Sequence, residues 1–421
     1  MNAKAVVHDT VAPSVRAPRI LPGTMLAFLV FLIGYTLSQF YRSFLAVIAP
    51  ELSAELHLSA TDLGNISACW FATFALAQFF VGAALDNQGP RRTLPALMLA
   101  GVAGAIVFAR ASDARSAMVA MGLIGIGCSA ALMGPLFVFA RTSPPHRFAL
   151  LSALIIGLGT LGNLLGGTPL AMAAEAFGWR NVFYGLAAIT LAAAALVGLL
   201  VKDPPRLSHA AHSGDGGIIS GLREILAIRA LWPVWPLMAF GYGILITERG
   251  LWVGPYLSEV HGLEPIARGN VIFLMAAAIG LGALAYGPLE SWLRRRKVLA
   301  LGGSLIAVAA LAALALPTNS TTAITTILLC VFGFSAMTYG TIMAHVRLFL
   351  PDPLLGRGMS FANFLCMGGA GILQMWSGVY VDHLKARGLT AAELFSTLHL
   401  ALAGILLVAT LIYAWSRESG D

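Results

Sequence analysis

The sequence predicts an all-α membrane protein in which twelve transmembrane helices form two pseudo-symmetric halves of six. Hydrophobic residues make up 58% of the 421 positions and charged residues only 11%, whereas soluble proteins carry about 25% charged residues. Twelve apolar stretches are long enough to cross a bilayer, which takes about 20 residues of α-helix. A repeat with a spacing of 205 to 207 residues relates the second half to the first. These observations exclude a soluble protein and predict a multi-span protein with a duplicated design.

Apolar stretches divide the chain into two groups of six predicted spans. The spans are expected at residues 23–50, 62–85, 93–111, 116–140, 148–174, 181–201, 231–257, 266–289, 298–316, 322–349, 359–381 and 393–415. The predicted domains are an N-terminal tail 1–22, a first half 23–202, a linker 203–230, a second half 231–416 and a C-terminal tail 417–421. The linker is rich in Pro, Ser, His and Gly up to Gly217. The residues after Gly217 predict a short interfacial helix. Its apolar face carries Leu222, Ile225 and Leu226.

Basic residues are distributed unevenly between the two sides of the predicted spans. Of the 26 Lys and Arg residues, about eighteen share a side with the termini, about six lie opposite and two fall inside spans. Basic loops stay cytoplasmic, so we expect a bacterial inner-membrane protein with both termini in the cytoplasm. The net charge of +7 then follows from topology and gives no reason to expect nucleic-acid binding. Residues 1–22 lack an apolar core, so no cleavable signal peptide is expected.

Two arginines occupy matching positions inside apolar spans. The segment GYTLSQFYR, which ends at Arg42, recurs as GYGILITER, which ends at Arg249. Each arginine follows its tyrosine, Tyr35 or Tyr242, by seven residues, so both side chains share one helix face. Gln39 lies on the same helix face as Tyr35 and Arg42, so these three side chains form a polar stripe on the first span. An unpaired guanidinium in hydrocarbon costs about 2.5 to 3.5 kcal/mol, so these arginines should face a polar interior or a ligand.

The repeat extends beyond the arginines through four successive spans. Its matched positions are Pro50 with Pro255, Leu52 with Leu257, Leu58 with Leu263, Gly64–Asn65 with Gly269–Asn270, Gly82 with Gly287, and Ser129–Ala130 with Ser335–Ala336. Inverted or parallel internal repeats are typical of transporters whose halves move against each other.

The loop after the second span carries the most specific motif. It reads Gly82-Ala-Ala-Leu-Asp86-Asn-Gln-Gly89-Pro-Arg91-Arg92 and resembles the signature loop of the major facilitator superfamily, G-x-x-x-D-[RK]-x-G-x-[RK]-[RK]. A weakened copy runs from Gly287 to Arg296 and Lys297, and the resemblance covers the whole chain. It implies an inside gate in which Asp86 pairs across the two halves, with gating residues Gly82, Asp86, Gly89, Arg91, Arg92, Gly287, Arg296 and Lys297. The alternative is that Arg91 and Arg92 only anchor the topology.

This resemblance also implies that spans 1, 4, 7 and 10 line a substrate cavity. A pair of arginines on spans 1 and 7 is similar to the arrangement in organic-anion and organophosphate transporters of the superfamily. The candidate substrate-binding residues are Arg42, Arg249, Tyr35, Gln39, Tyr242, Tyr339 and Thr341. Against this, either arginine could extend outward to the headgroups ahead of Pro50 or Pro255. The antiporter pattern G-P-x-x-G-G is damaged, because Asn163 replaces its proline, which disfavours a drug antiporter.

Few ionisable groups inside the spans could carry a coupling proton. Glu248 and His345 are the candidates, since a carboxyl in a dry site can exchange a proton when a nearby charge changes. The plainer alternatives are an ion pair between Glu248 and an arginine, and a hydrogen-bonded packing role for His345.

The sequence therefore predicts a secondary active transporter that works by alternating access on a small organic anion, a carboxylate or a phosphorylated compound. Protons or exchange would drive it, and it would act as a monomer in the lipid bilayer. An exporter of drugs or apolar metabolites is the alternative, and a membrane sensor that holds ligand without moving it is a rival of another class. We predict no enzyme, cofactor or metal site, because no nucleotide-binding loop G-x-x-x-x-G-K-[ST], ligand cluster or nucleophile with its base is found.

Overall fold

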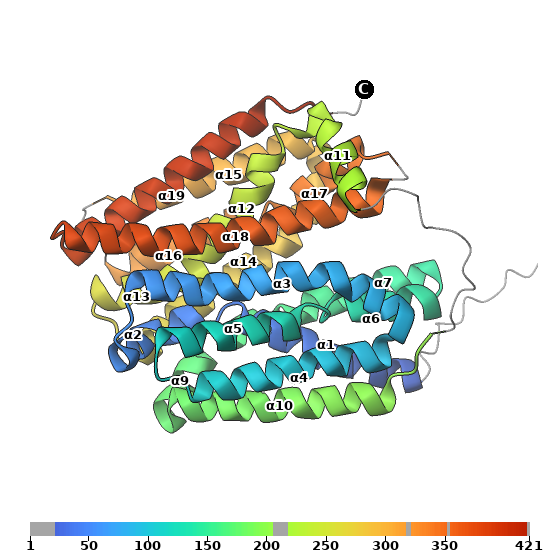
Figure 1. Ribbon diagram of the computed structural model, residues 1–421. Helices are drawn as coiled ribbons and strands as arrows, with labels where there is room; N and C mark the ends of the chain where they lie inside the picture. Colours follow the sequence, from blue (N-terminus) through green and yellow to red (C-terminus); the bar gives the residue numbers. More distant parts are fainter. Residues whose placement is uncertain (1–21, 205–217, 317–320, 352–353, 419–421) are drawn as a thin grey trace, which may run out of the picture.

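The computed structural model describes residues 22–204, 218–316, 321–351 and 354–418. The predicted N-terminal tail, up to residue 21, and most of the first part of the linker lie outside these residues. The first half of the chain, blue to green in Figure 1, forms one helical bundle, and the second half, yellow-green to red, forms another beside it. Ten helices in the described residues are by themselves long and apolar enough to cross a membrane, and two bent pairs bring the spans to twelve.

The first bundle contains ten helical segments that make six spans. These are α1 (Pro22–Tyr41), α2 (Leu45–Leu56), α3 (Ala60–Gln88), α4 (Pro90–Ala109), α5 (Ala114–Cys128), α6 (Met133–Thr142), α7 (Pro145–Gly159), α8 (Leu161–Leu165), α9 (Thr168–Phe177) and α10 (Trp179–Leu200). The short α11 (Ile218–Ala227) then lies in the predicted linker. Its Ile225 is buried, whereas Leu222 and Leu226 remain exposed.

The second bundle repeats the six spans. It contains η1 (Arg229–Leu231), α12 (Trp235–Thr247), η2 (Glu248–Trp252), α13 (Val253–Glu259), α14 (Pro265–Leu293), α15 (Arg296–Leu314), α16 (Thr322–Ser335), α17 (Tyr339–Phe349), α18 (Leu355–Ala386) and α19 (Ala391–Ala414). We call the side where α3 meets α4 and α14 meets α15 the linker side, because α10 and α11 also end there. The other side, which carries the connections 56–60 and 259–265, is called the opposite side.

Helix ends are fixed by side-chain caps on the opposite side. Ser59, Asp113 and Thr390 each accept a hydrogen bond from the backbone three residues on, and the residue there bonds back, which forms three capping boxes. The cap at Asp113 explains why the third and fourth spans separate although their apolar stretches nearly touch. On the linker side Gly89 has φ of 78° and its repeat counterpart Arg294 has φ of 52°, so both copies of the signature loop turn at a residue with positive φ.

Two repeat-matched spans, one in each half, are interrupted near their middle. The fourth span breaks between α5 and α6, and the tenth breaks between α16 and α17, at the repeat-matched pair Ser129 and Ser335. Each serine hydroxyl donates to a carbonyl of its own preceding turn, at 2.7 Å in both cases. Such bonds compete with the helical ladder, and the sequence repeat has therefore placed the same interruption in both halves.

Small residues hold the two bundles together. The α3 and α18 helices pack side by side (Figure 1), and a Cβ added to Gly64 would overlap the carbonyl oxygen of Gln374. Gly269, the repeat partner of Gly64, packs α14 against α9, where an added Cβ would be 2.8 Å from Cβ of Ala171. Both glycines thus allow close contact between the halves.

Polar bonds between the halves gather toward the opposite side. Asp382 at the end of α18 accepts hydrogen bonds from the backbone of Ala60 at 3.0 Å and of Thr61 at 2.8 Å, at the first turn of α3. Arg268 of α14 donates to Glu51 at 2.5 Å and to the carbonyl of Val47 at 3.0 Å in α2. A carboxylate at a helix N-terminus is stabilising, and these bonds close the opposite side between the halves.

Candidate functional site

Arg42 lies in a break of the first span. The helix α1 ends at Tyr41 and α2 begins at Leu45, and the two are bent by 51°. The Ser43 hydroxyl donates to the carbonyls of Gln39 at 3.2 Å and Phe40 at 3.3 Å, which favours a turn over continuation of the ladder. The span predicted over residues 23–50 is therefore not one straight helix, and Arg42 projects from a turn.

Arg249 lies in a π-helical segment of the seventh span. The segment η2 begins at Glu248 and ends at Trp252. Pro255 follows it and has no N–H to give to the carbonyl of Leu251, so the ladder must shift just ahead of the proline. Single π-turns of this kind are frequent at functional sites.

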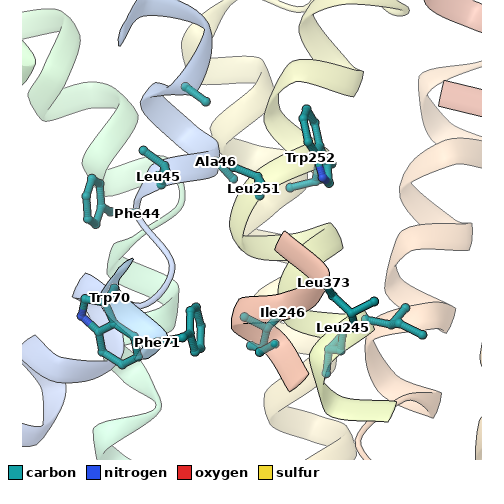
Figure 2. Close-up of a cluster of buried hydrophobic side chains, with 14 of the residues drawn as sticks. Phe44, Leu45, Ala46, Trp70, Phe71, Leu245, Ile246, Leu251, Trp252 and Leu373 are labelled. Carbon is teal, nitrogen blue, oxygen red and sulfur yellow. The ribbon is translucent and has the colours of Figure 1, made fainter. Parts of the chain in front are cut away.

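These two irregular segments pack against each other. An added Cβ at Gly250 would be 3.5 Å from the carbonyl oxygen of Arg42, and one at Gly254 would overlap the carbonyl oxygen of Ala46. That carbonyl lacks its helical donor, because the donor would be residue 50, a proline. Figure 2 shows Ala46 beside Leu251 across this contact. The matched prolines thus bring the two arginine segments together.

The Arg42 guanidinium is half-buried and reaches the other half. Its Nη1 donates to the hydroxyl of Tyr242 at 3.3 Å. Its Cζ lies 5.2 Å from the ring centroid of Trp70 and 5.6 Å from that of Phe74, distances at which a cation is attracted to an aromatic face. Its buried Nε has no partner in the part of the chain that the structure describes, so Arg42 keeps a donor that these residues do not use.

The Arg249 guanidinium is 2% exposed and reaches in the other direction. Its Nη2 donates to the carbonyl oxygen of Asn163 at 2.7 Å and its Nη1 to the Oδ1 atom of Asn163 at 3.3 Å. Each arginine therefore bonds to a residue of the opposite half. Neither extends outward to the headgroups, which was the alternative for both.

A chain of polar side chains continues from Tyr242 toward the linker side. The rings of Tyr242 and Tyr339 are 5.4 Å apart. The Tyr339 hydroxyl donates to Asn363 at 3.1 Å, and the Asn363 amide donates to Gln78 at 3.0 Å. This chain joins α12, α17, α18 and α3, so it again crosses between the halves.

The remaining predicted substrate residues are buried. Tyr35 and Gln39 are each 7% exposed and Thr341 is 2% exposed. Tyr35 packs against Gly159 of α7, where an added Cβ would overlap its ring. Oε1 of Gln39 and Oγ1 of Thr341 have no hydrogen-bond partner within the described ranges, and such unpaired atoms are unusual in buried positions.

Glu248 and Arg249 are neighbours in sequence but point to different partners. Oε1 of Glu248 lies 3.2 Å from Nε2 of His399 in α19, and both side chains are fully buried. Glu248 thus pairs with a histidine of its own half and not with an arginine. His345 lies near the linker-side end of α17, where its ring nitrogens are 2.6 Å from the Tyr413 hydroxyl and 2.7 Å from the carbonyl of Arg417. That geometry matches the packing role.

Asp86 and Arg91 of the signature loop bond to residues that lie before the linker helix α11. Asp86 accepts from Arg141 of α6 at 2.7 Å, whereas the gate prediction had Asp86 pair across the halves when the gate is closed. An added Cβ at Gly89 would collide with Asp203, which accepts from the backbone of Arg91 at 2.9 Å. Gly82 and Gly287 have open space around them.

The second copy of the loop is likewise held inside its own half. Arg296 bonds to Glu290 at 2.5 Å and Lys297 to the carbonyl of Ser416 at 2.6 Å. Arg92 is exposed. The bonds of both copies therefore leave the linker-side ends of the two bundles tied to their own halves.

Sequence reasoning missed the partners of the predicted residues. Asn163 was noted only as a departure from a proline pattern, and His399, Asn363 and Gln78 carried no signal of period or repeat. Their roles arise from contacts between spans far apart in the chain. In the described residues no three His, Cys, Asp or Glu side chains gather as metal ligands.

Comparison with known proteins assigns the family. The model of the Major Facilitator Superfamily matches residues 31–374. The chain belongs to the major facilitator superfamily. This is a family of multi-pass membrane transporters and not of enzymes, and it is the family that the signature loop and the repeated halves resemble.

Several relatives of this superfamily member have names that state a substrate. It is 24% identical over 260 residues to a probable sulfoacetate transporter of Cupriavidus necator, an alignment that spans 58% of this chain and 60% of the relative. It is 26% identical over 282 residues to a hexuronate transporter of Bacillus subtilis, covering 64% of each chain. It is 25% identical over 406 residues to a probable L-galactonate transporter of Escherichia coli, covering 87% of this chain and 85% of the relative. The first two alignments thus span less than two thirds of those relatives.

The fold agrees with solved transporters over nearly the whole chain. A bacterial homologue of the human lysosomal transporter Spinster, solved in an inward-facing and unoccupied conformation, superposes with a TM-score of 0.79. The match covers 94% of this chain and 97% of that chain at 18% identity. At this identity the likeness concerns the fold alone.

Proposed function

We propose that this superfamily member is a secondary active transporter that moves a small organic anion, a carboxylate or a phosphorylated compound, by alternating access. The observation that carries the proposal is the packing of the two helix breaks that hold Arg42 and Arg249, one from each half. A guanidinium can donate two parallel hydrogen bonds to a carboxylate or phosphate. An anion bound by both arginines would join the halves at the point where they must rock against each other.

The other candidate residues complete this binding role. Tyr242 and Tyr339 start the polar chain that leads away from Arg42, and the unpartnered oxygens of Gln39 and Thr341 can accept from a hydroxyl group of a substrate. Tyr35 holds the first span against α7. The residues of the signature loop, Asp86 and Arg91 among them, act as the gate on the linker side.

Three relatives have names that support an anionic substrate. Sulfoacetate, hexuronate and galactonate are all organic anions. The bias of basic residues toward the termini favours a bacterial inner membrane with cytoplasmic termini. Coupling to protons or exchange of anions would drive the transport, and a monomer contains both arginines and so the complete site.

Uptake by vesicles that contain the purified protein tests this proposal. Labelled sulfoacetate, galactonate and galacturonate should enter faster than into protein-free vesicles, whereas galactose should not, because it differs from galacturonate chiefly by the missing carboxylate. Movement of an apolar or cationic drug in place of the acids would establish the exporter alternative. Binding of an acid without any flux or exchange would establish the sensor alternative.

A further inference from the structure

A second buried polar site lies in the C-terminal half, apart from the arginine site. Its members are Glu248 at the start of η2 and His399 in α19, with 3.2 Å between Oε1 and Nε2 and no exposure of either side chain. Among the described residues, Oε2 of Glu248 and Nδ1 of His399 have no hydrogen-bond partner. Glu248 and His399 therefore share one hydrogen bond, and each residue keeps one further polar atom that could bind a proton.

Protonation decides whether such a pair can stay buried. With no proton added to the carboxylate and a neutral imidazole the pair carries one net negative charge, and with one proton it carries none. Burial away from water strongly disfavours net charge. The pair is thus neutral with one added proton, and a second proton would restore a net charge.

Few other ionisable groups face the pair. The ring of Tyr256 from α13 meets the His399 ring edge-on with centroids 4.9 Å apart, and Phe395 of α19 lies beside it. Arg249 follows Glu248 in the chain but bonds to Asn163 in the other half. Of the titratable side chains in the described residues, Tyr256 is thus the one in ring contact with the pair.

Polar groups continue from the pair toward the opposite side. The Tyr256 hydroxyl is 3.4 Å from Nε2 of His261, and the same nitrogen is 3.2 Å from Oγ1 of Thr325. His261 lies in the partly exposed connection between α13 and α14. His399 is eight residues from the start of α19 at Ala391, about 12 Å along the axis at 1.5 Å per residue. The pair is therefore nearer to the opposite side than to the linker side.

The pair is mechanically joined to the anion site. Glu248 and Arg249 are successive residues of one π-turn, and Glu248 faces α19 while Arg249 faces the other half. A π-turn differs from an α-helix by one inserted residue, so its backbone can rearrange without a change in the rest of the span. A change in the bonding of Glu248 would therefore act on the same backbone segment that holds Arg249.

We propose that Glu248 and His399 form a proton-binding site that couples proton uptake to the movement of the anion through the π-turn η2. The inference rests on the proposed anion transport. In the step itself one H⁺ from water binds to the pair, at Oε2 of Glu248 or Nδ1 of His399, and the charge of the pair changes from −1 to 0. The reverse step on the other side of the transport cycle returns the proton to water.

Vesicle experiments on three variants test the proposal. Glu248→Gln and His399→Gln should lose accumulation driven by a pH gradient and keep exchange of internal for external anion, because exchange moves no net proton. Thr410→Val is the matched control, since Thr410 is buried in the same helix and bonds only to its own turn at Leu406, 2.7 Å away. It should accumulate anion as the wild type does. Exchange retained by a variant also shows that it has folded.

Infrared difference spectra of the purified protein give a readout that needs no substrate. A change of pH should produce a carboxyl band in the wild type that Glu248→Gln removes and Thr410→Val keeps. Proton-driven accumulation retained in both pair variants would overturn the inference while leaving anion transport standing. If no anion moves at all, the proposed function fails, and the absence of the Glu248 band would separately overturn the proton site.

Discussion

The two arginine segments are copies of one sequence pattern but have different structures. The first copy ends its helix at Tyr41, and Arg42 sits in a turn with one hydrogen bond, at 3.3 Å to Tyr242. The second copy stays helical through a π-turn, and Arg249 makes two hydrogen bonds, at 2.7 Å and 3.3 Å, both to Asn163. Duplication therefore preserved the residue and changed its surroundings.

This difference assigns the arginines unequal tasks. A guanidinium has five N–H donors, of which Arg42 commits one to the protein and Arg249 two. Arg42 is half-buried beside aromatic rings, whereas Arg249 is 2% exposed. We expect Arg42 to contribute mostly to ligand binding, and Arg249 to contribute to both ligand binding and the contact between the halves.

The largest effect should come from filling the contact between the two breaks. A Cβ in Gly254→Ala would overlap the backbone carbonyl of Ala46, and overpacking of a tight contact costs about 1 to 3 kcal/mol or more. The thermal midpoint in detergent should fall and transport should be lost. Gly280→Ala, which meets nothing within 4 Å in α14, should retain both. Equal behaviour of the two variants would show that the breaks do not pack as described.

Loss of the bonds to Asn163 should rank second. A lysine ammonium cannot reproduce the planar fork of Arg249, so Arg249→Lys should lose about 1.5 to 3 kcal/mol of stability from hydrogen bonds to a charged group. Arg42→Lys should lose less, because Arg42 makes a single bond to Tyr242. Thermal midpoints measured without ligand check the order. A larger drop in Arg42→Lys would reverse the assignment of tasks.

Removal of the Tyr242 hydroxyl should have a smaller effect, limited to anion binding by Arg42. Tyr242→Phe deletes the acceptor that orients Arg42, which should weaken anion affinity by about 0.5 to 1.5 kcal/mol, or roughly 2-fold to 13-fold. Tyr380→Phe, whose ring stacks on Trp376 at 5.0 Å, serves as the control. Calorimetric titration of both variants makes the test, and equal affinities would mean that Tyr242 does not position Arg42.

The gate residue should affect rate and little else. The side chains of Asp86 and Arg141 are 60% and 25% exposed, and an exposed ion pair contributes about 0 to 1 kcal/mol. Asp86→Asn should therefore leave the thermal midpoint and anion affinity nearly unchanged while slowing transport. Ser291→Ala alters the position of the second half that matches Asp86, where the hydroxyl bonds to Gly287 of its own helix at 3.1 Å. This variant should leave the thermal midpoint, the anion affinity and the transport rate unchanged. Normal transport by Asp86→Asn would remove its gate role.

The sequence predicted the duplicated fold because apolar length and repeated glycines and prolines act locally. Gly64 and Gly269 recur at the packed contacts between the halves, and both copies of the signature loop turn at a residue with positive φ. The break at Arg42 escaped prediction, since no glycine or proline lies between Tyr41 and Leu45 to announce it. Pro255 explains the π-turn only after the structure has shown which carbonyl groups and N–H groups of this segment pair with each other.

Side-chain partners were the least predictable part of the site. Glu248 and Arg249 are successive residues, so their side chains point in different directions, one to α19 and the other to Asn163. The sequence alone does not show which spans lie in those two directions. His345 looked equivalent to other buried histidines until both of its nitrogens were seen to be engaged. Pairing across distant spans is a property of the packed bundle, whereas periodicity is a property of each span.

Anion binding by the two arginines is the central claim, and calorimetric titration of purified protein with the best transported acid tests it most directly. Arg42→Lys and Arg249→Lys should each weaken binding by about 1.5 to 3 kcal/mol, roughly 10-fold to 150-fold, and the double variant should lose less than the sum because both residues share one ligand. Unchanged affinity in both single variants would contradict the claim.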